Sequence, residues 1–190
     1  MIDDEDTWKS NYAKIPPDPT GALGPTLIAT FVSLGVTLKL QTDPSVVKID
    51  PPPLFTWIQP LFETTLRQLA LVPAIEPVSP AIQTATAWGQ ATTASQLIIL
   101  PGAALNPPPP GTNGIAAVAL AVIDPSSVAT GVAGIIKDLV AAPPSDDPTD
   151  VVFPVAIRKA FAGLRYIISG IDTKPPPTGP IPFLLTATVI

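Results

Sequence analysis

Residues 150–170 read DVVFPVAIRKAFAGLRYIISG, and they contain the clearest structural pattern in the chain. Large apolar side chains recur there every three or four residues, which is the period of one face of a helix. The members of this stripe are Phe153, Ile157, Phe161, Leu164 and Ile168. Asp150 can cap the start of such a helix and Gly170 can end it. The stretch therefore predicts a single amphipathic helix, with Ile157 and Phe161 buried in the core.

Prolines at the start of other apolar stretches indicate further helices, because proline is tolerated in the first turn, where its missing N–H is not needed. Residues 54–71 have a helical apolar spacing that is interrupted by Pro60, which predicts a kink or two shorter helices. Further helices are expected over residues 25–41 and from Pro80 and Pro125 onward.

Three shorter stretches are candidates for strands. Residues 45–50 are short and can pair as a strand, and residues 97–100 form a brief apolar run. Residues 114–123 are uncharged and fit either a helix or a strand by pattern alone, although their alanine content favours a helix. The fold expected from these patterns is mostly α, with five or six proline-punctuated helices, one or two short strands, and extended N- and C-terminal arms.

The 27 prolines are about three times the average share, and they divide the chain. Consecutive prolines occur at 51–53, 107–110 and 175–177, but their flanking sequences do not match well enough to indicate an internal repeat. We expect an N-terminal arm over residues 1–20, a helical domain over residues 21–174 and a proline-rich C-terminal arm over residues 175–190.

The residue types that carry most enzyme chemistry are missing or scattered. The chain has no histidine and no cysteine, which excludes Ser-His-Asp and Cys-His catalysis and leaves no thiolate ligand for zinc. It has no glycine-rich phosphate-binding motif. Glu63 and Glu76 stand alone, and Asp146, Asp147 and Asp150 lack the spacing of a calcium loop, so solvation and helix capping explain them better. We therefore expect no enzyme activity, no cofactor and no metal site.

Charge and hydropathy narrow the class of partner. The net charge is −5 and the ten Lys and Arg residues are scattered, which argues against nucleic-acid binding. The longest uncharged apolar run, residues 115–123, is half the length of a membrane span, and the acidic first six residues do not fit a signal peptide. Only 13% of the residues are charged, so we expect much of the exterior to face other protein.

Both ends of the chain carry side chains suited to contact with a partner. Trp8 and Tyr12 lie four residues apart, where they either pack on the domain or anchor to a partner. The tail is apolar and strand-like, and an exposed strand of this kind is an aggregation site. Its candidate partner-binding residues are Phe183, Leu184, Leu185, Val189 and Ile190. We expect the tail to dock on a neighbouring chain; the alternative is pairing with residues 45–50 or 97–100 of its own chain.

A chain without cysteine or histidine, rich in Ala, Thr, Val and Pro and with an arm at each end, resembles the small structural proteins of tailed bacteriophage virions. The resemblance is one of style over the whole chain and rests on no specific motif. It implies a capsid, neck, tail or baseplate component that is assembled in the host cytoplasm. We therefore expect a structural subunit that is oligomeric in its assembly and contacts other protein subunits, with neither nucleic acid nor membrane as a partner. The alternative is a non-enzymatic, monomeric adaptor that presents its proline-rich segments as ligands.

Overall fold

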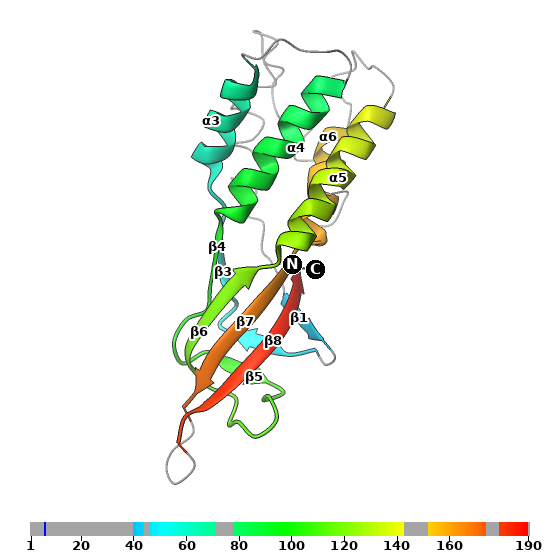
Figure 1. Cartoon of the computed structure of the whole chain (residues 1–190). Coiled ribbons are helices and arrows are strands. Elements are labelled where there is room, and N and C mark those ends of the chain that lie inside the picture. Colours follow the sequence, from blue (N-terminus) through cyan, green and yellow to red (C-terminus); the bar gives the residue numbers. More distant parts are fainter. Residues whose placement is uncertain are drawn as a thin grey trace.

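The computed structural model describes Asp6 and residues 40–43, 46–70, 78–142, 152–173 and 179–189. This part of the chain is elongated, with helices side by side at one end and β-strands at the other (Figure 1). The chain passes between the two ends four times. The two ends are therefore built from interleaved segments, and one hydrophobic core runs through both of them.

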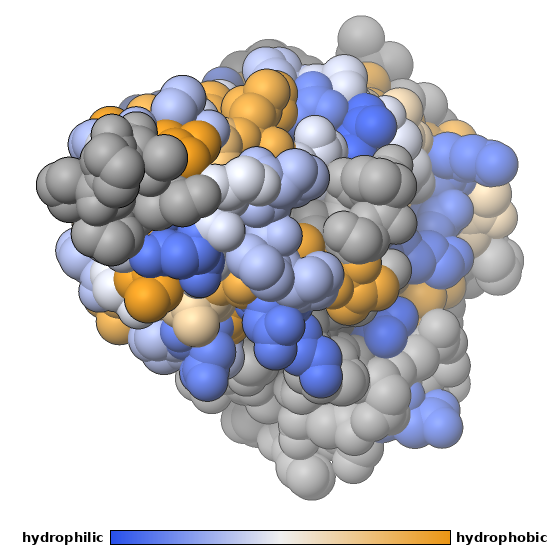
Figure 2. All heavy atoms as spheres, turned by 90° about the horizontal axis from the view of Figure 1, so that it is seen from below, coloured by the Kyte–Doolittle hydropathy of each residue, from blue (hydrophilic) through white to orange (hydrophobic). Residues whose placement is uncertain are grey.

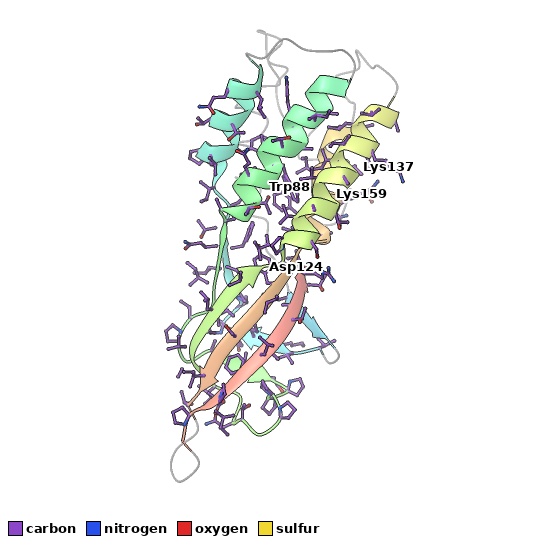
Figure 3. All side chains as sticks on the ribbon, in the orientation of Figure 1. Trp88, Asp124, Lys137 and Lys159 are labelled. Atoms are coloured by element: carbon purple, nitrogen blue, oxygen red, sulfur yellow. The ribbon has the colours of Figure 1, made fainter. Side chains whose placement is uncertain are left out.

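Four helices are described: α3 (Gln59–Ala70), α4 (Val78–Thr93), α5 (Pro125–Ala141) and α6 (Val152–Ala162). α4 packs between α3 and α5, and α6 packs against α5. The contact between α4 and α5 is close because the fully buried ring of Trp88 lies on Gly131, where an added Cβ would approach Cη2 of the ring to 2.5 Å (Figure 3).

Four strands form an antiparallel sheet in the order β1, β8, β7, β6. Their bounds are β1 (Leu40–Asp43), β8 (Ile181–Val189), β7 (Arg165–Asp172) and β6 (Ala116–Ile123). The other described strands form two antiparallel pairs, β2 (Lys48–Asp50) with β5 (Ala104–Asn106) and β3 (Leu54–Thr56) with β4 (Gln96–Ile98). β5 lies behind the four-stranded sheet in Figure 1. The viewer therefore sees the face of that sheet that is turned away from β5.

Aromatic rings fill the core where the helices meet the strands. Phe161 of α6 makes edge-to-face contacts with Phe55, Trp57 and Trp88, at ring-centroid distances of 6.3, 5.6 and 5.5 Å. Such pairs stabilise the fold beyond the burial of their area. Ile157 and Phe161 are each 4% exposed, which confirms the prediction that both are core residues.

Asp124 links the sheet to the helices. Its carboxylate accepts a hydrogen bond from the backbone N–H of Ser126 at 2.9 Å, and Pro125 occupies the first position of α5. The same carboxylate forms an ion pair of 3.0 Å with Arg165, the first residue of β7. The prediction that a helix begins at Pro125 is confirmed, and its cap also ties α5 to the sheet.

The prediction of one helix over residues 150–170 is wrong in its second half. α6 ends at Ala162, and Arg165–Asp172 forms β7. Leu164 and Ile168 are four residues apart, and an even spacing fits one face of a strand as well as one face of a helix. Residues of β7 alternate between exposed and buried along most of its length, so the true period in this half is two.

The preference for a helix over residues 114–123 is also wrong, because Ala116–Ile123 is β6. Val118, Leu120 and Val122 alternate there with alanines, and this period of two matches the pleat of a strand. Pairing with β7 along the strand outweighs the intrinsic helix propensity of alanine, which is a weak preference in a folded protein.

The predicted fold class, mostly α with one or two short strands, is therefore wrong, and the described residues form four helices and eight strands. Two local predictions are confirmed in part, since β2 falls within residues 45–50 and β4 overlaps residues 97–100. Residues 54–71 form a short strand and then α3, so Pro60 lies in the first turn of a helix and not at a kink. The helix expected over residues 25–41 lies mostly outside the described residues, and its last two positions belong to β1.

The prediction of an extended C-terminal arm is also wrong. Residues Ile181–Val189 form β8, which lies between β1 and β7 inside the sheet. The tail thus pairs within its own chain, which is the alternative interpretation, although its partners are β7 and β1 and not residues 45–50 or 97–100. The physical reason is that β7, which the sequence pattern presents as a helix, supplies the strand edge on which the tail pairs.

Candidate interaction surface

One face of the four-stranded sheet is directed away from the rest of the described core. Alternation along the strands turns six large aliphatic side chains to this side, and they are between 44% and 71% exposed. The register of β6, β7 and β8 arranges the outward residues in three rows. We call these nine residues the outer face: Val118, Ile171 and Pro182; Leu120, Ser169 and Leu184; Val122, Ile167 and Thr186.

The opposite face of the same sheet is buried. Tyr166, Ile168 and Phe183 point to this side and join one core with Ile49 of β2 and Leu105 of β5. Both faces are apolar, but only the inner one is covered by other described residues, those of β2 and β5 among them. The outer face therefore has the composition of a buried surface, although it is exposed in the single chain.

None of the nine residues of the outer face is ionisable, and Asp43 of β1, the register partner of Thr186, lies at the edge of the sheet beside them. At the helical end of the sheet, Arg165 is already paired with Asp124 at 3.0 Å. Soluble proteins usually place charged side chains on an open sheet, because charge opposes association with other chains. Seen from the sheet end, hydrophobic residues reach the surface in several places, beside both weakly and strongly hydrophilic ones (Figure 2). This lack of charge on an aliphatic surface is the property expected of a protein contact.

The partner-binding residues predicted from the sequence do not lie together in the structure. Leu184 lies on the outer face and is the most exposed of its large side chains, at 71%. Phe183 and Val189 are buried in the core of their own chain, and Leu185 is half-buried against that core. Ile190, Trp8 and Tyr12 lie outside the described residues.

Sequence reasoning missed most of the outer face. Its other large residues are Val118, Leu120, Val122, Ile167 and Ile171. The signal that identifies the first three is the alternation of large aliphatic residues with alanine along β6, without a charge to mark an exposed side. Ile167 and Ile171 carry no such signal. Apolar residues occur on both faces of β7, and the sequence does not say which face β2 and β5 cover.

A buried carboxylate elsewhere in the sheet has a structural role. Asp172 is fully buried, and its carboxylate accepts hydrogen bonds from the backbone N–H groups of Asn113 at 3.2 Å and Ile115 at 3.0 Å. These bonds hold the loop that follows the proline run at 107–110 against the end of β7. These two donors are backbone groups, and their bonds fix the loop.

Two buried aromatic residues carry polar atoms without a hydrogen-bond partner, namely the indole N–H of Trp88 and the hydroxyl of Tyr166. Burial raises the pKa of the Tyr166 hydroxyl above its ordinary value of 10.0, so this group stays protonated at neutral pH. Each atom belongs to a ring packed in the hydrophobic core, and neither faces the outer face.

Among the described residues, no three acidic side chains gather closely enough to hold a metal ion. No helix in the same ranges is both long and apolar enough to span a bilayer. The carboxylates considered from the sequence at Glu76, Asp146, Asp147 and Asp150 lie outside these ranges, and the side chain of Glu63 is not described.

Comparison of the chain with family models, with curated proteins and with solved structures found no match. A functional proposal for this chain therefore has to be argued from its own structure, and the outer face is the feature that we use.

Proposed function

We propose that this chain is a non-catalytic structural subunit of a large protein assembly, and that its outer face is a contact with a neighbouring subunit. The observation that carries the proposal is an aliphatic sheet face that the described part of the chain leaves exposed. The resemblance in style to bacteriophage structural proteins supports a virion as that assembly, formed in the host cytoplasm. Capsid, neck, tail and baseplate remain equivalent choices on this ground.

The size of the outer face supports a contact of this kind. Six aliphatic side chains that are roughly half exposed present about 600 Å² of apolar surface, which is at the upper end for the largest patch on a monomer. Isolated exposed apolar residues need no explanation, whereas a contiguous patch of this size marks an interaction surface.

The alternative, an adaptor that presents its proline runs as ligands, is less well supported. The run at 107–110 is held against its own chain, because the hydroxyl of Thr112 donates to the carbonyl of Pro109 at 2.7 Å and Asp172 fixes the residues that follow. Pro109 is itself buried, whereas Pro107, Pro108 and Pro110 are exposed. A proline-rich ligand for an aromatic groove needs an extended and accessible segment.

A polar version of the outer face tests the proposal. We expect the triple variant Leu120→Thr, Val122→Thr and Leu184→Thr to keep its melting temperature, because threonine suits strands and the replaced side chains are exposed. Binding of a hydrophobic dye such as ANS to the folded chain should fall sharply in this variant.

The matched control is Ile82→Thr, Leu100→Thr and Val140→Thr, which removes exposed apolar side chains from other parts of the molecule. This control should bind the dye like the wild-type chain. At a concentration low enough for the wild-type chain to be monomeric, a wild-type chain that binds no dye, or equal dye binding in all three proteins, would contradict a contact role for the outer face.

A further inference from the structure

We propose that the neighbour on the outer face is a second copy of this chain, which packs face to face about a two-fold axis so that two sheets form a β-sandwich. This inference rests on the proposed function, because it names the partner of the same surface. The occupant is argued below from the area of the outer face, from its charge and from the arrangement of its rows.

The area of the outer face is sufficient for a stable dimer. Two copies would bury about 1,200 Å² from the six aliphatic side chains alone, which reaches the lower limit for specific protein–protein interfaces. Pro182, Ser169 and Thr186 lie in the same rows and add to this area. The resulting interface would have an apolar centre, as homodimer interfaces do.

The outer face is compatible with itself in charge. A two-fold contact brings the same patch of both copies together, so any charge near its centre would face a like charge. The nine residues of these rows on β6, β7 and β8 are not ionisable, and the third row continues at the sheet edge to Asp43 of β1, which pairs with Thr186. Arg165, at the helical end, is neutralised by Asp124 at 3.0 Å. A copy of this chain therefore meets no like charge at the centre of this face, where Ser169 lies between Leu120 and Leu184.

The middle row gives the contact a centre. Ser169 pairs with Leu120 on one side and with Leu184 on the other, so a small residue lies between two leucines. A two-fold axis through this point places Ser169 opposite its copy, with the leucines packed around the pair. Sheets packed in this way lie about 10 Å apart.

Strand addition at the edge of β6 would be a different arrangement. It would extend the sheet sideways and satisfy backbone groups, but the aliphatic rows of both copies would stay in water. Face-to-face packing buries those rows, and burial of apolar area is the main source of stability in association. The face is therefore the better site for the second copy.

Charge exchange at Ser169 tests the proposal. We expect wild-type chain to sediment as a dimer, and Ser169→Glu or Ser169→Lys alone to weaken dimerisation by about a hundredfold, because like charges would then face each other across the axis. An equimolar mixture of the two variants should form a heterodimer, since glutamate would then face lysine. The control Ala133→Glu places the same charge on the exposed side of α5 and should leave the dimer intact.

Cross-linking provides a second measurement that does not depend on a charged variant being folded. The chain has no cysteine, so Ser169→Cys introduces a single, nearly isosteric thiol. A short bis-maleimide should link two copies through this position, and Ala133→Cys should give little product. Dimers that persist in Ser169→Glu, or that cross-link equally at both positions, would overturn the face-to-face arrangement.

A monomeric wild-type chain would also overturn the second copy as partner, and dye binding then decides the fate of the proposed function. If the monomer binds ANS and the polar triple variant does not, the outer face is a contact for a different protein and the assembly role stands. If neither protein binds the dye, both proposals fail.

Discussion

The Phe161 ring contacts three other aromatic rings: Phe55 of β3, Trp57 just after β3, and Trp88 of α4. Replacing it with alanine removes these contacts and leaves a cavity in a core that cannot collapse fully. We expect Phe161→Ala to cost about 3–5 kcal/mol of the free energy of unfolding and to lower the melting temperature by roughly 6–20 °C. Differential scanning calorimetry measures the change, and a shift too small to detect would show that the ring is not part of the core.

Asp124 makes stability depend on pH. Hydrogen bonds from the side chain and the backbone of Ser126, with a smaller contribution from Arg165, hold the pKa of this carboxylate below its ordinary value of 3.8. A group with a lowered pKa stabilises the fold above the unfolded-state pKa and loses that contribution as pH falls through the folded value. We expect Asp124→Ala to lower the melting temperature by a few degrees at pH 7.

The difference between wild type and Asp124→Ala should remain constant from pH 7 down to about pH 5 and then shrink toward pH 2. Asp138→Ala, which removes an exposed ion pair with Lys159, is the control and should change the melting temperature little at pH 7. A difference that grows in acid would show that the folded carboxylate is not the stabilised species.

At the scale of elements, two glycines of α5 give opposite expectations. A Cβ added at Gly131 would come within 2.5 Å of the Trp88 ring. A Cβ added at Gly134 would meet open space. We expect Gly131→Ala to cost about 1–3 kcal/mol by overpacking the α4–α5 contact. Gly134→Ala should instead stabilise the protein by about 0.5–1 kcal/mol, because alanine favours a helix. Equal effects at the two positions, measured by urea unfolding, would contradict the close approach of these helices.

β8 is an inner strand of the sheet, so the tail is required for the fold. A chain truncated after residue 178 loses the partner of both β1 and β7 and the buried side chains of Phe183, Ala187 and Val189. We expect this shortened chain to be unfolded by circular dichroism. A truncated chain with a cooperative thermal transition would show that the tail is a separable arm, as the sequence alone predicts.

The sequence predicts some of these elements well and others badly for physical reasons. A capped start such as Asp124 with Pro125 is a local signal, and it locates α5 correctly. The end of α6 and the start of β7 lack such a signal, because Leu164 and Ile168 suit either period. The outer face was largely unpredictable, since the exposure of Ile167 or Leu120 depends on which side β2 and β5 cover. Only Leu184 was identified from sequence among its aliphatic residues.

At the scale of the whole molecule, helices and strands share one core, and the open side of the sheet is the main surface that the described chain leaves apolar. The described chain crosses between its helical end and its strand end four times, so both ends belong to one interleaved fold. One aliphatic face on such a fold suits a subunit that is held among neighbours. The central claim is therefore that the outer face is a contact between protein chains.

Sedimentation equilibrium over a wide range of concentrations tests this claim most directly, with the wild-type chain and the polar triple variant at Leu120, Val122 and Leu184 measured side by side. We predict that the wild-type chain associates with increasing concentration, whereas the triple variant stays monomeric and keeps the melting temperature of the monomeric wild-type chain. Association of equal strength in the two proteins would contradict the claim, because the outer face would then have no part in bringing chains together.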